Sequence, residues 1–172
     1  MVTYRLDNRG VVKWVKRVGS VESNDLSSIA LSSDLHIALS GRARYDGTTY
    51  GTHITTLSVD GAILMSKVYY LVTMSTYGKV VANVDGGFIV QGSAKFAPST
   101  IYKPIVYKVN SALEIQWAVK VDDNLSTQDK YVYARFPMVA SNGDIVIVGY
   151  MDKTESSLDD TFVLRLNANG EV

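Results

Sequence analysis

Side chains capable of acid–base or metal chemistry are few in this chain of 172 residues. It has no cysteine and two histidines, His36 and His53, which excludes disulfides, thiolate metal sites and a cysteine nucleophile. Each histidine lies in a strand-like pattern, without the short helical spacing of a zinc-binding pair. We therefore expect two structural strand histidines, no histidine metal site and no serine–histidine catalysis.

Carboxylate pairs form the second group, at Asp122–Asp123 and Asp159–Asp160. With Asn124 and Asp129, the first pair supplies oxygen ligands of the kind that calcium prefers. Solvated loop carboxylates explain the same pattern, and we predict no metal site. Gly86–Gly87 lacks the lysine and following helix of a phosphate loop, so no nucleotide or other cofactor is expected.

Aromatic side chains are the third group, and their chemistry is stacking. Tyr45 and Phe96 each lie four positions after a repeated glycine, and Tyr50 and Tyr102 lie further along the same predicted loops. Such residues could stack on sugar rings or anchor a protein partner, or they could cover sheet edges. We take Tyr45, Tyr50, Phe96 and Tyr102 as the candidate ligand-binding residues.

Charge balance and apolar patterning argue against two classes of partner. Lys and Arg number 17 and so do Asp and Glu, whereas a nucleic-acid-binding domain is usually basic. The sequence shows neither a signal-peptide pattern nor an apolar run of the roughly 20 residues that a membrane helix needs. We expect no nucleic-acid and no membrane partner. The compartment stays undefined, and a virion or extracellular setting is the one we favour.

An internal repeat is the main signal that positions these residues. Three stretches end in a glycine, with spacings of 51 and 57 residues: Gly41, Gly92 and Gly149. Aligned on these glycines, three turn pairs coincide: Asp34–Leu35, Asp85–Gly86 and Asn142–Gly143. A second pattern with nearly the same period places three large residues in one column: Trp14, Met65 and Trp117. Two patterns with one period predict a repeat architecture.

Each unit is predicted to contain four short strands, at 28–32, 36–41, 53–57 and 62–70 in the first complete unit. Runs of β-branched and aromatic residues, separated by turn pairs, are typical of short strands. The sequence shows no helical periodicity. A glycine within a strand marks a bulge or a close backbone approach, and we expect the indoles to pack between sheets. We predict one all-β domain, residues 1–172, with units at 1–18 (partial), 19–70, 71–121 and 122–172.

The repeat resembles a known family. The patterns are Leu6-Asp7-x-x-Gly10-x-Val12-x-Trp14 and Ile29-Ala30-x-x-x-Asp34-x-x-Ile37-x-x-x-Gly41. They resemble bacterial β-propeller repeats of the SBBP type and, more loosely, PQQ-type blades. The resemblance implies four-stranded propeller blades but carries over no functional residue, because the motifs are structural. Two positions depart from the pattern, Met65 in place of tryptophan and Ala112–Leu113 in place of a glycine turn.

Counting the units gives about three blades, whereas propellers typically have four to eight. We therefore expect a partial propeller completed by further blades of a longer chain, or a ring formed by self-association. The expected function is a non-catalytic scaffold or binding module for a protein or glycan partner, as part of a virion or cell-surface protein. The alternatives are a carbohydrate-binding propeller and a fragment of a propeller enzyme, either a hydrolase or a quinone-dependent oxidoreductase.

Overall fold

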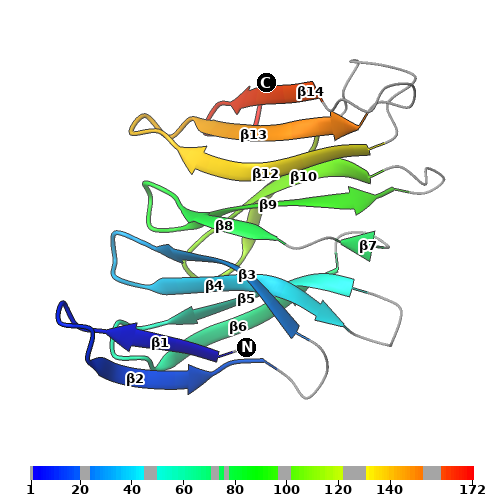
Figure 1. Cartoon of the computed structure of the whole chain (residues 1–172). Coiled ribbons are helices and arrows are strands. Elements are labelled where there is room, and N and C mark those ends of the chain that lie inside the picture. Colours follow the sequence, from blue (N-terminus) through cyan, green and yellow to red (C-terminus); the bar gives the residue numbers. More distant parts are fainter. Residues whose placement is uncertain are drawn as a thin grey trace.

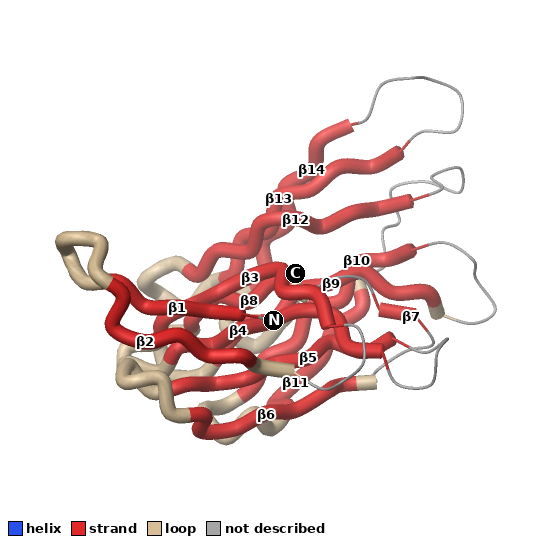
Figure 2. The backbone as a smooth tube through the Cα atoms, turned by 60° about the horizontal axis from the view of Figure 1, so that its bottom comes forward, coloured by secondary structure: helices blue, strands red, loops and turns tan. Residues whose placement is uncertain are grey.

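The computed structural model describes residues 2–19, 24–44, 50–70, 74–75, 78–96, 102–121, 131–152 and 160–172. These ranges contain fourteen strands and no helix (Figure 2). The prediction of an all-β chain is therefore confirmed. Within the same ranges there is no long apolar helix of the kind that crosses a membrane.

The first two sheets come from the N-terminal part of the chain. A two-stranded sheet consists of β1 (Val2–Leu6) and β2 (Val12–Arg17). A four-stranded antiparallel sheet follows, in the order β3 (Asn24–Leu31), β4 (Ile37–Arg44), β5 (Tyr50–Leu57) and β6 (Ile63–Tyr69). Figure 1 shows these sheets and the later strands stacked in chain order.

The third sheet has eight strands and is itself made of two groups. The first group is β7 (Met74–Ser75), β8 (Lys79–Ala82), β9 (Phe88–Lys95), β10 (Tyr102–Val109) and β11 (Ile115–Lys120). The second group is β12 (Tyr131–Val139), β13 (Ile145–Asp152) and β14 (Asp160–Leu166). One parallel pair, Tyr102 with Tyr131, joins the groups. The units expected to be separate thus touch edge to edge at this point.

One turn geometry recurs seven times in the described residues. In each turn the first residue donates its N–H to the carbonyl of the fifth, and the fourth donates to the carbonyl of the first, at 2.8–3.2 Å. The fourth residue always has a left-handed φ, between 55° and 87°: Gly10, Leu35, Gly61, Gly86, Leu113, Gly143 and Gly170. The three turn pairs aligned in the sequence are therefore confirmed as equivalent turns.

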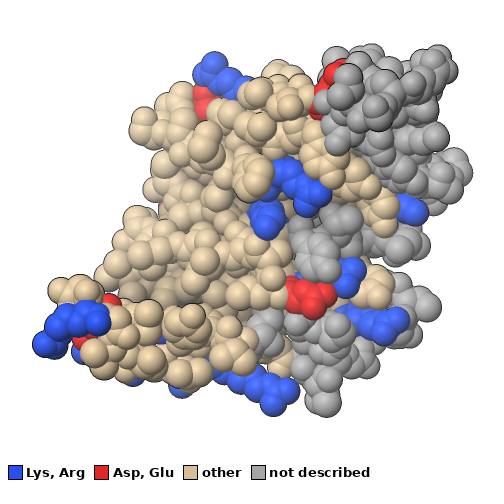
Figure 3. Space-filling view, in the orientation of Figure 1, with Lys and Arg blue, Asp and Glu red and all other residues tan. Residues whose placement is uncertain are grey.

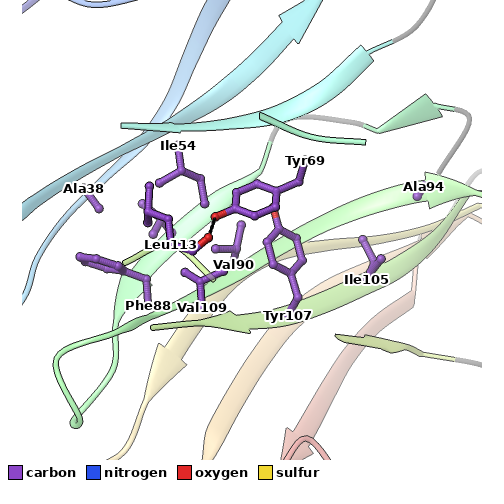
Figure 4. Close-up of a cluster of buried hydrophobic side chains, with 11 residues drawn as sticks. Ala38, Ile54, Tyr69, Phe88, Val90, Ala94, Ile105, Tyr107, Val109 and Leu113 are labelled. Atoms are coloured by element: carbon purple, nitrogen blue, oxygen red, sulfur yellow. Dashed lines mark hydrogen bonds between the residues drawn. The ribbon is translucent and has the colours of Figure 1, made fainter. Parts of the chain in front are cut away.

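Apolar side chains fill the space between successive sheets. The largest cluster joins the β3–β6 sheet to β8–β11 and contains Ile54, Tyr69, Phe88, Tyr107 and Leu113, among others (Figure 4). A second cluster joins β9 and β10 to β12–β14, and a third places Val18 against β4 and β5. The indoles of Trp14 and Trp117 pack at the edges of these clusters, between sheets as predicted.

Candidate ligand-binding site

Two β-bulges, one in β3 and one in β12, shape the candidate site. Ser27 is the residue left unpaired by the bulge in β3, and Arg135 is its counterpart in β12. A bulge interrupts the strand ladder and redirects the side chain of the extra residue. The bulges therefore turn a hydroxyl and a guanidinium away from the regular pleat of their sheets.

The repeated glycines make room for these bulges. A Cβ atom on Gly41 would lie 1.8 Å from the carbonyl oxygen of Asp25, and one on Gly149 would lie 2.2 Å from that of Tyr133. Because the obstructing atoms belong to the backbone, no side chain fits at either position. The expectation that these strand glycines mark a bulge or a close approach is confirmed here.

Both bulges line a pocket of about 490 Å³, which we call the Tyr133 pocket. Its lining residues come from four strands: Leu26 and Ser27 of β3, Lys79 of β8, Ser93 of β9, and Tyr133, Ala134 and Arg135 of β12. This volume lies within the usual range for small-molecule sites. Figure 3 shows Lys and Arg side chains gathered over β12 on this face of the molecule.

Side-chain hydrogen bonds between strands hold the pocket wall together. The Lys79 Nζ donates to the carbonyl of Ser27 at 2.8 Å, and the Ser27 hydroxyl donates in turn to the carbonyl of Gly78. On the other side, the buried amide Nε2 of Gln91 donates to the carbonyl of Ala134 at 3.1 Å. These bonds link β3 to β8 and β9 to β12. The side chains that line the pocket are thus held in place before any ligand arrives.

An aromatic group continues from the pocket along β12 and β13. The ring of Tyr133 stacks with that of Tyr102 at 6.4 Å and contacts that of Tyr150 at 5.0 Å. The guanidinium carbon of Arg135 lies 5.6 Å from the Tyr133 ring and 5.2 Å from the Tyr150 ring. A hydrogen bond of 2.8 Å from Arg135 to the Tyr150 hydroxyl completes the group. Aromatic and cationic surfaces are therefore presented together.

The candidate residues from the sequence are only partly brought together. Tyr102 joins the Tyr133 group and also has Lys95 over its ring at 4.8 Å. Tyr50, the first residue of β5, lies under the guanidinium of Arg42 at 4.4 Å. Phe96 faces Lys120 at 5.2 Å. Tyr45 lies outside the described residues, so its prediction stays open.

His53 takes part in a polar group that sequence reasoning missed. Its Nε2 lies 2.8 Å from the hydroxyl of Ser66 and 3.0 Å from that of Thr55. Burial lowers the pKa of His53 from its ordinary value of 6.5. Its Nδ1 has no hydrogen-bond partner among the described residues. We interpret this group as a cross-strand contact between β5 and β6.

The other candidate residues from the sequence are His36 and the acidic segment of residues 122–129. The backbone N–H of His36 donates to the Ser32 hydroxyl at 3.1 Å, at the end of the β3–β4 turn. The acidic segment of residues 122–129 lies outside the described ranges. Within those ranges no three His, Asp or Glu side chains are grouped closely enough to hold a metal ion.

Comparison with known proteins finds a likeness to solved structures but none to a family model or a curated protein. Among solved structures, an endo-arabinase from Bacteroides thetaiotaomicron is similar, with a TM-score of 0.52 and 11% sequence identity. The alignment covers 94% of this chain and 63% of the enzyme, so the chain spans less than two thirds of its length. At this identity the likeness concerns the fold alone.

Proposed function

We propose that this chain is a set of β-propeller blades that acts as a non-catalytic binding module, with its ligand in the Tyr133 pocket. The observation that carries the proposal is that strands from three different groups line the pocket. Strands β3, β8 and β12 each belong to a different group of strands, and each contributes polar side chains to one cavity. In a propeller, sheets arranged in this way surround a central channel.

The exposure of equivalent residues supports the propeller interpretation. Ile54, Val106 and Val163 occupy the same place in three groups of strands, one residue after the partner of the repeated glycine. The first two are fully buried between sheets, whereas Val163 is 69% exposed. At the other end of the stack, Ile29 is 61% exposed while its counterpart Val80 is 1% exposed. The two end faces thus have the composition of sheet-to-sheet contacts.

These end faces support a proposal about assembly. The β12–β14 face exposes Phe136, Met138 and Val163. The opposite face includes an apolar groove of about 620 Å³ between β1 and β3, lined in part by Tyr4, Ile29 and Leu31. Exposed apolar faces of this kind favour association. The partner we propose is a second copy of this chain, whose sheets would continue the stack.

A carbohydrate-binding propeller, or a fragment of a propeller hydrolase, is the second candidate function. The structural likeness to an endo-arabinase favours it, as does the combination of hydroxyl groups and an aromatic ring in the Tyr133 pocket. Glycoside hydrolysis requires a pair of carboxylates beside the scissile bond. A binding assay combined with a cleavage assay therefore separates a binding module from a hydrolase.

The experiment is a glycan array probed with the purified chain, followed by a reducing-end assay on every glycan that binds. A binding module retains glycans without releasing new reducing ends, and Tyr133→Ala abolishes retention. The control variant is Tyr70→Ala, which removes a 44% exposed tyrosine outside both the Tyr133 pocket and the groove between β1 and β3. The release of new reducing ends would show that the chain is a hydrolase and not a non-catalytic binding module. Retention that survives Tyr133→Ala, or no retention at all, would contradict the proposed site.

A further inference from the structure

We propose that the Tyr133 pocket selects carboxylate-bearing sugars, with Lys79 and Arg135 binding the carboxylate. The inference rests on the proposed function, because it assigns a ligand class to the same pocket. It begins with the placement of the two cations. Lys79 enters from β8 and Arg135 from β12, and both line one cavity of about 490 Å³. The described lining contains no carboxylate beside them.

The contacts of these two cations are to uncharged groups. Other cations in the described residues do form ion pairs, among them Lys13 with Asp7, Arg42 with Asp25, Lys108 with Asp85 and Arg165 with Asp144. The contacts of Lys79 and Arg135 are instead to uncharged groups, the Ser27 carbonyl and the Tyr133 and Tyr150 side chains. Their positive charges are therefore available to an anion in the pocket.

The geometry of the cations suits a carboxylate. One hydrogen bond to Ser27 leaves the Lys79 ammonium two further protons, and the bond to Tyr150 leaves most of the Arg135 guanidinium donors unused. A guanidinium binds a carboxylate through two parallel hydrogen bonds, and a lysine adds a point charge. A partly enclosed pocket strengthens such pairing because fewer water molecules screen it.

The uncharged part of the lining favours a sugar as the carrier of the carboxylate. Ser27 and Ser93 line the pocket from neighbouring sheets, and the Ser27 hydroxyl, which donates to the carbonyl of Gly78, can still accept a hydrogen bond. Tyr133 supplies an aromatic surface beside Arg135. A pyranose ring presents hydroxyls at its rim and C–H groups on its face, so it can use both kinds of contact. A uronic acid adds the carboxylate.

The test is isothermal titration of the purified chain with trigalacturonate and, separately, with the neutral trisaccharide galactotriose. Trigalacturonate should bind more tightly by roughly tenfold or more, as expected for charge-assisted hydrogen bonds, and its affinity should fall as salt rises. Lys79→Gln and Arg135→Gln should each remove most of this preference. Arg135→Lys should keep part of it, because the charge remains. Circular dichroism melts show whether each variant is folded.

Arg17→Gln is the matched control, because Arg17 is an exposed residue of β2 outside the pocket. This variant should bind trigalacturonate as the wild type does. Equal affinity for the two trisaccharides, or a preference that survives in folded Lys79→Gln and Arg135→Gln variants, would overturn the ligand class while leaving the binding module standing. Loss of all sugar binding, here and on the array, would instead contradict the proposed function itself.

Discussion

Gly61 lies directly against the indole of Trp14, and a Cβ atom at position 61 would lie 2.8 Å from Cδ2 of the ring. The indole Nε1 also donates to the carbonyl of Val59 in the same turn, at 2.9 Å. Gly170 stands in the same relation to Trp117, with 3.0 Å to Cε3. A tryptophan in one group of strands therefore leaves room only for a glycine in the turn of the next group.

This relationship explains together the two departures from the repeat. Met65 occupies the tryptophan column, and the corresponding turn residue is Leu113, which has a left-handed φ of 55°. Leu113 is fully buried, and its carbonyl accepts hydrogen bonds from Lys67 and Tyr69. Where no indole covers the turn, a leucine side chain contributes to the core instead.

Gly61→Ala should destabilise the chain more than Gly10→Ala. Both glycines have φ of +80°, but a Cβ at position 10 meets nothing within 4 Å. Gly10→Ala therefore pays only the left-handed penalty of about 1–2 kcal/mol. At position 61 the clash with Trp14 adds a further ~1–3 kcal/mol. Urea unfolding of both variants measures the difference, and equal losses would show that the indole imposes no constraint.

Trp14→Met should reduce the cost of Gly61→Ala. The smaller, flexible methionine removes the ring that a Cβ would contact, as at Met65 in the next sheet. A double-mutant cycle should therefore give a coupling of about 1–3 kcal/mol between positions 14 and 61. The same cycle with Gly10→Ala serves as the control and should give additive effects. Additivity in both cycles would refute the link between indole and turn.

Leu35→Gly and Leu113→Gly should change stability in opposite directions. Both leucines have left-handed φ values, 60° and 55°, and glycine relieves this strain. Leu35 is 56% exposed, so its replacement should stabilise by about 0.5–1 kcal/mol. Leu113 is fully buried, and loss of its side chain should cost ~2–5 kcal/mol. Urea unfolding midpoints measure the direction of each change in stability. A Leu35→Gly variant less stable than the wild type would contradict the prediction.

The sequence identified the parts of this fold that depend on local chemistry. Asp85–Gly86 and Asn142–Gly143 mark turns because few residues adopt a left-handed φ, and Gly41 marks a bulge because no Cβ fits there. The pocket was not predictable in the same way. Lys79 and Arg135 lie 56 positions apart in the sequence, and only the packing of separate strands brings them to one cavity. The strand glycines were the available signal, since two of them shape the bulges.

Stability should fall as the pH drops below 6.5, through His53. Burial holds the pKa of His53 below 6.5 in the folded chain, so the unfolded chain binds more protons at this site. Unfolding free energy therefore rises with pH up to about the unfolded pKa, and the contribution is lost on acidification. Urea unfolding at pH 7.5 and 5.5 should show a smaller pH effect for His53→Gln than for the wild type. An unchanged slope in His53→Gln would exclude His53 as its source.

Self-association through the end faces should raise the solution mass with concentration. Val163 lies on one face and Ile29 on the other, and each is exposed where its counterpart in another sheet is buried. Light scattering should therefore approach twice the chain mass as concentration rises. Val163→Lys and Ile29→Lys should each shift the equilibrium toward the monomer, because burying an ammonium in the contact is costly.

Val84→Lys provides the control for charge and for loss of an exposed valine. Val84 is 58% exposed in the β8–β9 turn, away from both end faces, so this variant should associate as the wild type does. A wild type that remains monomeric at every concentration would contradict assembly with a second copy. Association weakened equally by all three variants would assign the contact to general surface charge. A loss confined to the end-face variants would show that the contacts between sheets within the chain also operate between chains.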